Sequence, residues 1–157
     1  QSMKNYQNRN NNLKNRENNR MQADIDLSNV VETAEYINVY ESGEMTTYSN
    51  REKPFEVIVE GWKNMLQGSH EMPAFGVSLN RETTKALKDG TWVEFVFETQ
   101  NYYNEMPFEK LLVNVEKSFQ GFNIIRYNAN GGYDGRCYYV DLVNKNMTDF
   151  YNIIVNL

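Results

Sequence analysis

Cys137 and His70 are the first candidates for chemistry, because a thiolate activated by an imidazole can attack an acyl carbon. A reactive thiol needs a base or a cation nearby to lower its pKa. Alternation along a strand puts Cys137 on the same face as Asp141, and a carboxylate raises the pKa of a thiol instead. His70 follows Gly-Ser in a turn, where histidine is commonly polar surface. The pattern favours a cysteine that fills space, so no catalytic residue is assigned.

Carboxylates in the second half of the chain are the next candidates. Period-two alternation puts Glu94 and Glu98 opposite a stripe of Val and Phe, and Glu116 and Asp141 are expected on the same face. Two carboxylates about 5 to 9 Å apart can hydrolyse a glycosidic bond. A solvated acidic strand face produces the same pattern without chemistry, and we expect this simpler arrangement. A small hydrolase that uses this face remains an alternative function.

The segment 128–135 is rich in oxygen-bearing side chains, but only Asp134 in it is charged. A calcium loop needs more acidic ligands and a distal Glu, so we expect a hairpin turn around Asn130-Gly131-Gly132 and no metal site. The chain also has no phosphate-cradling glycine loop, zinc finger, nucleophile elbow or dinucleotide fingerprint. No cofactor is therefore expected.

An aromatic segment offers the best candidate for binding. Residues 100–108 are expected to form a loop between two strands, and they are rich in Tyr and Asn. Tyrosine provides rigid contact area with a polar tip, and amides add hydrogen bonds, which suits a protein or glycan partner. In the competing interpretation Met106 and Phe108 pack into the core and the tyrosines are half exposed. The candidate binding residues are Tyr102, Tyr103, Asn104, Phe108 and Tyr133.

Helices are predicted where apolar residues recur at three and four positions. These segments are 54–67, 81–89 and 148–155. Residues 29–40 have two interpretations, which both stay open here. They form an amphipathic helix, or residues 36–41 pair with 44–49 across Ser42-Gly43.

Strands are predicted where apolar residues alternate or form short runs. They cover 72–79, 91–98, 111–116, 122–127 and 136–143. Short connections that contain Gly or Asn suit an antiparallel meander. The sequence therefore predicts an α+β domain, with an antiparallel sheet of about four to five strands and helices packed on one face.

Composition excludes several classes of protein. The chain has 157 residues, of which 40% are apolar and 13% aromatic, so it is not wholly disordered. Apolar runs are only a few residues long, and no segment of this sequence is expected to span a membrane. A single cysteine excludes an internal disulfide framework and a Cys-rich zinc module, and a single histidine argues against a His-based metal site.

Charge divides the chain into a basic arm and an acidic body. Residues 1–20 hold five Lys or Arg, one Glu and eight Asn, which gives this arm a net charge of +4. The net charge of the whole chain is −5, so the remaining residues carry −9. An acidic body repels nucleic acid, and no nucleic-acid partner is expected. We expect residues 1–22 to be a polar arm or linker, and residues 23–157 to form one domain.

Gln1-Ser2-Met3 resembles the remnant of a cleavable purification tag, so natural sequence is expected to begin near Lys4. A polar spacer before a folded domain is typical of a protein with an N-terminal membrane anchor. We therefore expect a native anchor upstream of Lys4 and an extracytoplasmic, cell-surface location. Two observations favour the cytoplasmic alternative. Cations just past a membrane segment favour the cytoplasmic side, and a free cysteine suits a reducing compartment.

Residues 5–43 resemble the membrane-distal part of a bacterial type IV pilin or pseudopilin. The resemblance rests on Asn5-Tyr6-Gln7-Asn8, on Met21-Gln22-Ala23-Asp24-Ile25, and on a helix-like stretch that ends at Glu41-Ser42-Gly43. It implies a helix followed by an antiparallel sheet, in a subunit whose hydrophobic N-terminal segment has been removed.

The sequence thus leads to three hypotheses of function. The first is a non-enzymatic binding or structural domain, extracytoplasmic and tethered to the membrane, which captures a protein or glycan through Tyr102–Phe108. The second is the pilin-like subunit, and the third is the hydrolase. The sequence does not set the oligomeric state.

Overall fold

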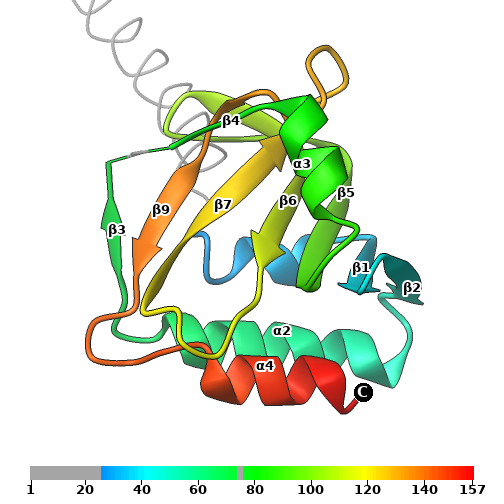
Figure 1. The fold of residues 1–157 in the computed structure, drawn as a ribbon, viewed down its shortest axis with the longest axis vertical. Helices are drawn as coiled ribbons and strands as arrows, with labels where there is room; N and C mark the ends of the chain where they lie inside the picture. Colours follow the sequence, from blue (N-terminus) through cyan, green and yellow to red (C-terminus); the bar gives the residue numbers. More distant parts are fainter. Residues whose placement is uncertain (1–25, 74–75) are drawn as a thin grey trace, which may run out of the picture.

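The computed structural model describes residues 26–73 and 76–157, and it has the predicted α+β class with an antiparallel sheet. The main sheet has seven strands instead of four to five, in the order β2-β1-β5-β6-β7-β9-β3 (Figure 1). All neighbours in this sheet are antiparallel. A second sheet pairs β4 with β8. The arm predicted over residues 1–22 lies outside the described residues.

The main sheet consists of β1 (Tyr36–Glu41), β2 (Glu44–Ser49), β5 (Thr91–Tyr103), β6 (Met106–Asn114), β7 (Gly121–Tyr127), β9 (Tyr138–Asp141) and β3 (His70–Met72). The small sheet consists of β4 (Val77–Ser78) and β8 (Gly135–Arg136). The helices are the 3₁₀ turn η1 (Val30–Thr33), α2 (Lys53–Leu66), α3 (Asn80–Ala86) and α4 (Thr148–Val155). Within this described part of the chain, no helix is long and apolar enough to cross a membrane.

Residues 36–49 form a hairpin, which confirms one of the two interpretations of this segment, and the alternative helix over 29–40 is wrong beyond the short turn η1. Tyr36 pairs with Ser49 and Glu41 with Glu44, which leaves Ser42-Gly43 as a two-residue turn. Both turn residues have positive φ, 51° and 86°, which suits a tight hairpin. The helix that the pilin resemblance implies up to Gly43 is therefore replaced by strands in residues 36–41.

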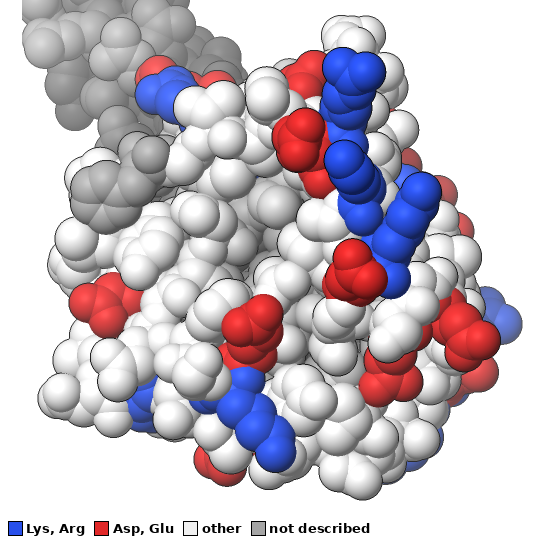
Figure 2. Space-filling model, in the orientation of Figure 1, with Lys and Arg blue, Asp and Glu red and all other residues white. Residues whose placement is uncertain are grey.

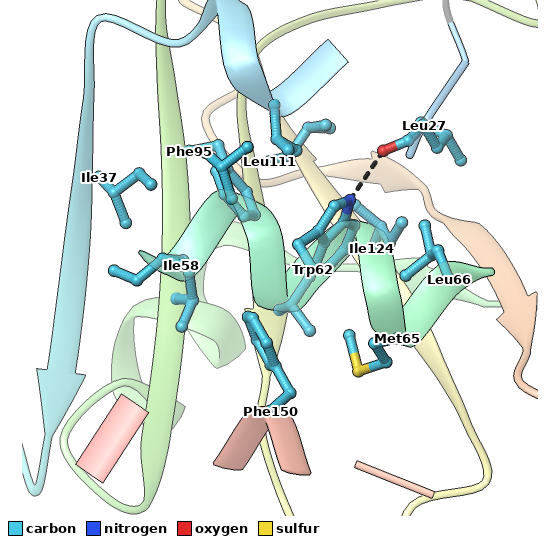
Figure 3. Packing of buried hydrophobic residues seen from close by; sticks show 14 of the residues in the cluster. Leu27, Ile37, Ile58, Trp62, Met65, Leu66, Phe95, Leu111, Ile124 and Phe150 are labelled. Atoms are coloured by element: carbon cyan, nitrogen blue, oxygen red, sulfur yellow. Dashed lines mark hydrogen bonds between the residues drawn. The ribbon is translucent and has the colours of Figure 1, made fainter. Parts of the chain in front are cut away.

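One face of the sheet, which we name the first face, is covered by α2 and α4 and carries the main core. Figure 1 shows the two helices side by side beneath the sheet. Trp62 of α2 lies at the centre of this core (Figure 3). Its ring meets Phe95, Phe122 and Phe150 edge to face, and its Nε1 donates to the carbonyl of Leu27 at 2.8 Å. The wide apolar stripe predicted for 54–67 thus becomes a buried helix face.

Helices were predicted on one face of the sheet only. The opposite face, which we name the second face, is nevertheless partly covered by a helix. α3 lies over it (Figure 1), and Leu87 at the end of α3 packs against a small cluster of Trp92, Leu112 and Tyr133. Helices therefore cover both faces, although α3 is short and covers only part of the second face. The strand predicted over 72–79 is likewise replaced, because β3 and β4 belong to two different sheets.

The loop predicted over 100–108 is wrong, because both strands continue into it. β5 runs to Tyr103 and β6 resumes at Met106, so only Asn104-Glu105 forms the turn. These residues have positive φ, 49° and 61°, which fits a two-residue hairpin. The register of β5 shifts between Val96 and Asn101. Such an irregularity bends a strand and re-aims the side chains beyond it.

Candidate binding site on the second face of the sheet

The tip of the β5–β6 hairpin holds three of the five predicted binding residues. Tyr102 is 46% exposed there, and Asn104 belongs to the turn. Tyr103 is half-buried, donates a hydrogen bond from its hydroxyl to Glu71, and meets Tyr138 edge to face at 5.1 Å. The tip therefore presents one exposed tyrosine on a firmly anchored turn.

The other two predicted residues are buried and lie in different clusters. Phe108 is fully buried in the main core, where it packs against Phe97 and Tyr138. Tyr133 is 6% exposed in the small cluster of the second face. The structure therefore does not gather the five residues on one surface. The residue type of a Tyr or Phe does not by itself show whether the side chain is buried in the core or exposed.

The predicted carboxylates are not gathered either. Glu94 is 1% exposed, whereas Glu98 and Glu116 are exposed. Glu98 lies within the register shift of β5, beside Val30 and Thr33, in a shallow depression of about 320 Å³. Glu116 follows the end of β6. The strand face that carries Glu94 was predicted to be solvated, but it is buried at this residue.

Glu94 accepts hydrogen bonds from three neutral side chains. Its Oε1 accepts from Asn38 Nδ2 at 3.1 Å and from the Tyr40 hydroxyl at 3.3 Å, and its Oε2 accepts from the Tyr133 hydroxyl. Thr47 donates to Asn38 Oδ1 at 2.7 Å and so holds the amide in this orientation. Burial, and next the charge of Glu94, raise the pKa values of Tyr40 and Tyr133 above their ordinary value.

The loop that carries Tyr133 is held against α3 and β4. Asp134 accepts from the backbone N–H of Asn80 at 2.6 Å, and Asn80 Oδ1 accepts from the backbone N–H of Tyr133 at 3.0 Å. Ser78 donates to the carbonyls of Tyr133 and Gly135. Asp134 thus accepts a hydrogen bond at the start of α3. Across residues 26–73 and 76–157, no group of three His, Cys, Asp or Glu side chains could hold a metal.

Cys137 and His70 are separate. Cys137 is 3% exposed, and burial raises the pKa of its thiol. His70 lies exposed on β3, opposite Asp141 of β9. A buried thiol with a raised pKa is a poor nucleophile.

β7 places a row of half-exposed and exposed side chains on the second face. Asn123 is exposed, and Ile125 and Tyr127 are half-buried, at spacings of two residues. Tyr139 of β9 lies directly opposite Asn123. Lys110 of β6 lies directly opposite Tyr127 and holds its Nζ 4.3 Å from the centre of that ring. Three adjacent strands thus contribute aromatic, amide and aliphatic groups to one surface.

The surface is hollowed over β7. Figure 2, in the orientation of Figure 1, shows the hollow between β9 and α3, and its visible centre is formed by uncharged atoms of the described residues. Gly76 forms part of the wall, because a Cβ added there would lie 3.2 Å from Asn123 Nδ2. Tyr133 meets Tyr127 edge to face at 5.0 Å and so connects the Glu94 cluster to the same surface.

Asn123, Ile125 and Tyr127 were not predicted to belong to a site. Alternation along 122–127 does put them on one face of a strand. What the sequence lacks is a sign that this face stays partly open, since that depends on where α3 and the loop 128–135 lie. A comparison with known protein families, characterised proteins and solved structures finds no match for this chain.

Proposed function

We propose that this is a non-enzymatic binding domain that takes its ligand in the hollow over β7. One observation carries the proposal. The second face of the sheet is hollowed over β7, its visible centre is uncharged, and aromatic and amide side chains from β7 and its neighbours lie around it, with Lys110 over Tyr127 at one end. Concave, largely uncharged surfaces with a few polar groups are the usual sites for ligands.

The groups that could react support binding over catalysis. Glu94 is buried, and three donors already occupy its carboxylate oxygens. A general acid or base must reach the proton that it transfers, and a carboxylate in this setting is better suited to holding structure. The buried Cys137 thiol, with its raised pKa, is similarly unsuited to attack.

The hollow also has rigid walls. The loop 128–135 is fixed to α3 through Asn80 and Asp134, and Tyr133 is fixed to Glu94. A site whose shape is set before the ligand arrives loses less entropy on binding. The buried polar cluster therefore supports the binding role by positioning one side of the hollow.

Two small uncharged probes, phenol and N-methylacetamide, test the proposed site by amide chemical shifts of the ¹⁵N-labelled chain. We expect both to shift the amides of residues 123–127 and 139. Asn123→Lys should abolish these shifts, because a long cationic side chain at this exposed position would occupy the hollow. Tyr102→Ala, at the hairpin tip, is the matched control and should leave them unchanged.

Shifts confined to residues 101–105, or shifts that survive Asn123→Lys, would move the site away from β7. The spectrum of each variant without probe shows whether the chain is folded, because the dispersed amide resonances of the sheet must be retained.

The native setting is a second part of the proposal. A domain that binds through one open sheet face can act at a cell surface while tethered by an N-terminal anchor upstream of Lys4. Fractionation of cells that express the full native gene, followed by protease treatment of intact cells, tests this. Recovery of the protein in the soluble cytoplasmic fraction would exclude the tether.

A further inference from the structure

We infer that the free edge of β2 is a self-association surface, to which a second copy of this chain adds its own β2 in the antiparallel direction. β2 is the last strand of the main sheet, and among the described strands it pairs with β1 alone. Figure 1 shows it at the right-hand rim of the molecule. The strands β1, β5 and β6 separate it from β7, so this surface is distinct from the proposed binding site.

β2 lacks the features that usually protect a sheet edge from further pairing. Such features include a very short strand, proline and lysine. The opposite edge is protected in this way, because β3 has three residues and is followed by Pro73. β2 has six residues, contains neither proline nor lysine, and is exposed at every position except the half-buried Tyr48. Its Met45 is an apolar side chain with 55% of its surface in water. β2 is thus the edge that can accept another strand.

The backbone of β2 offers hydrogen-bonding groups in a self-complementary order. Ser49 directs its N–H away from β1 and donates to Glu52 Oε2 at 2.6 Å. Because this direction alternates along a strand, Met45 and Thr47 also direct their N–H and C=O groups to the free edge. When two copies pair about a two-fold axis at Thr46, Met45 of each copy lies opposite Thr47 of the other. These residues then exchange hydrogen bonds, and the pair closes as a symmetric dimer.

Charges at the two ends of β2 favour an antiparallel second copy. Glu44 begins the strand beside the turn Ser42-Gly43, whereas Arg51 follows its other end. Both side chains are exposed, and neither forms a salt bridge within the described part of the chain. Antiparallel pairing brings Glu44 of each copy to the end of the other copy that carries Arg51, so opposite charges approach each other twice. Parallel pairing would bring like charges together at both ends.

The side chains also suit a second copy better than a foreign peptide. In this register Thr46 lies opposite Thr46, and the two Met45 side chains are diagonal neighbours within reach of each other. Each exposed methionine would then be covered by the other. A foreign peptide that adds a strand gains its specificity from pockets for alternate side chains. The side chains of residues 44–47 all stand exposed, which does not suit such pockets.

Sedimentation velocity of the full chain, from about 10 µM to about 1 mM, tests the inference. We expect a monomer that converts to a dimer as the concentration rises, because a contact along one strand is smaller than a standard stable interface. Met45→Lys should abolish the dimer, since lysine on an edge strand opposes pairing. Leu79→Lys is the matched control and should leave the dimer unchanged, because Leu79 is 56% exposed but lies outside β2.

Two charge reversals, Glu44→Arg and Arg51→Glu, test the antiparallel direction. Each variant alone turns two attractive contacts into repulsive ones and should weaken the dimer by about tenfold. An equimolar mixture of the two variants should restore association, because each contact between unlike copies again joins an Arg to a Glu. Hydrogen exchange at the amides of Met45 and Thr47 should slow in the dimer, since these groups are then hydrogen-bonded.

A chain that stays monomeric at about 1 mM would overturn the inference. A dimer that Met45→Lys leaves intact would also overturn it, because association would then use another surface. If the mixed charge variants associate no better than either one alone, antiparallel pairing of β2 is excluded. Circular dichroism of each variant shows whether the fold is retained. If Met45→Lys does not fold, the mixture of charge variants decides.

Discussion

Glu94 is the residue at which the pattern of the sequence and the structure differ most. It lies in the middle of a central strand, on the face that alternation predicts to be solvated, and it is 1% exposed. Its partners are Asn38, Tyr40 and Tyr133, which are all neutral. A buried carboxylate without a cation is tolerable only when hydrogen bonds replace the water that it has lost. The cluster is therefore expected to be sensitive to the loss of each donor.

Removal of the Tyr133 hydroxyl should destabilise the fold more than removal of the Tyr40 hydroxyl. Tyr133 is 6% exposed and donates to Glu94, whereas Tyr40 is half-buried and donates at 3.3 Å. We expect Tyr133→Phe to lower the free energy of unfolding by about 2 kcal/mol, the usual value for a hydrogen bond to a charged group, and Tyr40→Phe to lower it by about 1 kcal/mol or less. Urea unfolding measures both. Equal losses, or the reverse order, would show that Glu94 depends on Tyr133 no more than on Tyr40.

At the scale of the element, sequence periodicity predicted α2 and α4 well because their apolar stripes are wide, whereas α3 ends at Ala86, three residues before the predicted 81–89. α2 and α4 lie within a residue of the predicted 54–67 and 148–155 at every end. The hairpin 36–49 was one of two open interpretations, since its Tyr, Val and Thr suit strands while their spacing also suits a helix. The strand ends near 100–108 were missed, because Tyr and Asn there are equally typical of loops.

The site was harder to predict than the elements, for a physical reason. Which strand face stays open depends on contacts between distant segments, such as Asn80 with Asp134 and Ser78 with Tyr133. These contacts leave no periodic trace in the sequence. Glu98 likewise lies within the register shift between Val96 and Asn101, and nothing in the local residue pattern marks this shift.

Packing of α2 on the sheet should depend strongly on Trp62. We expect this residue to contribute more to stability than Trp92, the tryptophan of the second face. Trp62 is fully buried, contacts three aromatic rings and donates to the carbonyl of Leu27 (Figure 3). Trp62→Ala should cost about 3 to 5 kcal/mol through the cavity that it leaves. The milder Trp62→Phe should cost about 2 kcal/mol, because it keeps most of the packing but leaves a buried carbonyl without its donor.

Trp92 provides the matched control for Trp62. It is 6% exposed and donates to the carbonyl of Asp89 at 2.9 Å, but it belongs to the small cluster with Leu112 and Tyr133. Trp92→Phe should therefore cost less than Trp62→Phe in the same urea unfolding experiment. If the two costs are equal, the small cluster of the second face is as important to stability as the main core.

At the scale of the whole molecule, two faces of one sheet are stabilised differently. The first face packs a large apolar core against α2 and α4, whereas the second face holds the small cluster of Trp92, Leu112 and Tyr133 and the hydrogen bonds of Glu94. Buried tyrosines occur on both faces. Burial raises the pKa of Tyr133 on the second face and of Tyr138 on the first. Stability should accordingly depend on pH in the alkaline range.

The direction of this dependence follows from the raised pKa values. In the unfolded chain a tyrosine ionises near its ordinary pKa of about 10, whereas in the folded protein burial keeps Tyr133 and Tyr138 neutral above that pH. Their contribution to stability is complete below about pH 10 and is lost as pH rises further, because the unfolded chain then releases protons that the folded chain retains.

Each such tyrosine adds a slope of up to about 1.4 kcal/mol per pH unit. Urea unfolding from pH 8 to 11.5 should show a fall that begins above about pH 8.5, where the Cys137 thiol ionises in the unfolded chain, and that steepens above about pH 10 as the tyrosines do. Tyr133→Phe should make the fall shallower by about the slope of one tyrosine. Tyr102→Phe at the exposed tip is the control for the loss of a tyrosine, and an alkaline slope that Tyr133→Phe leaves unchanged would mean that this hydroxyl is not held neutral by the fold.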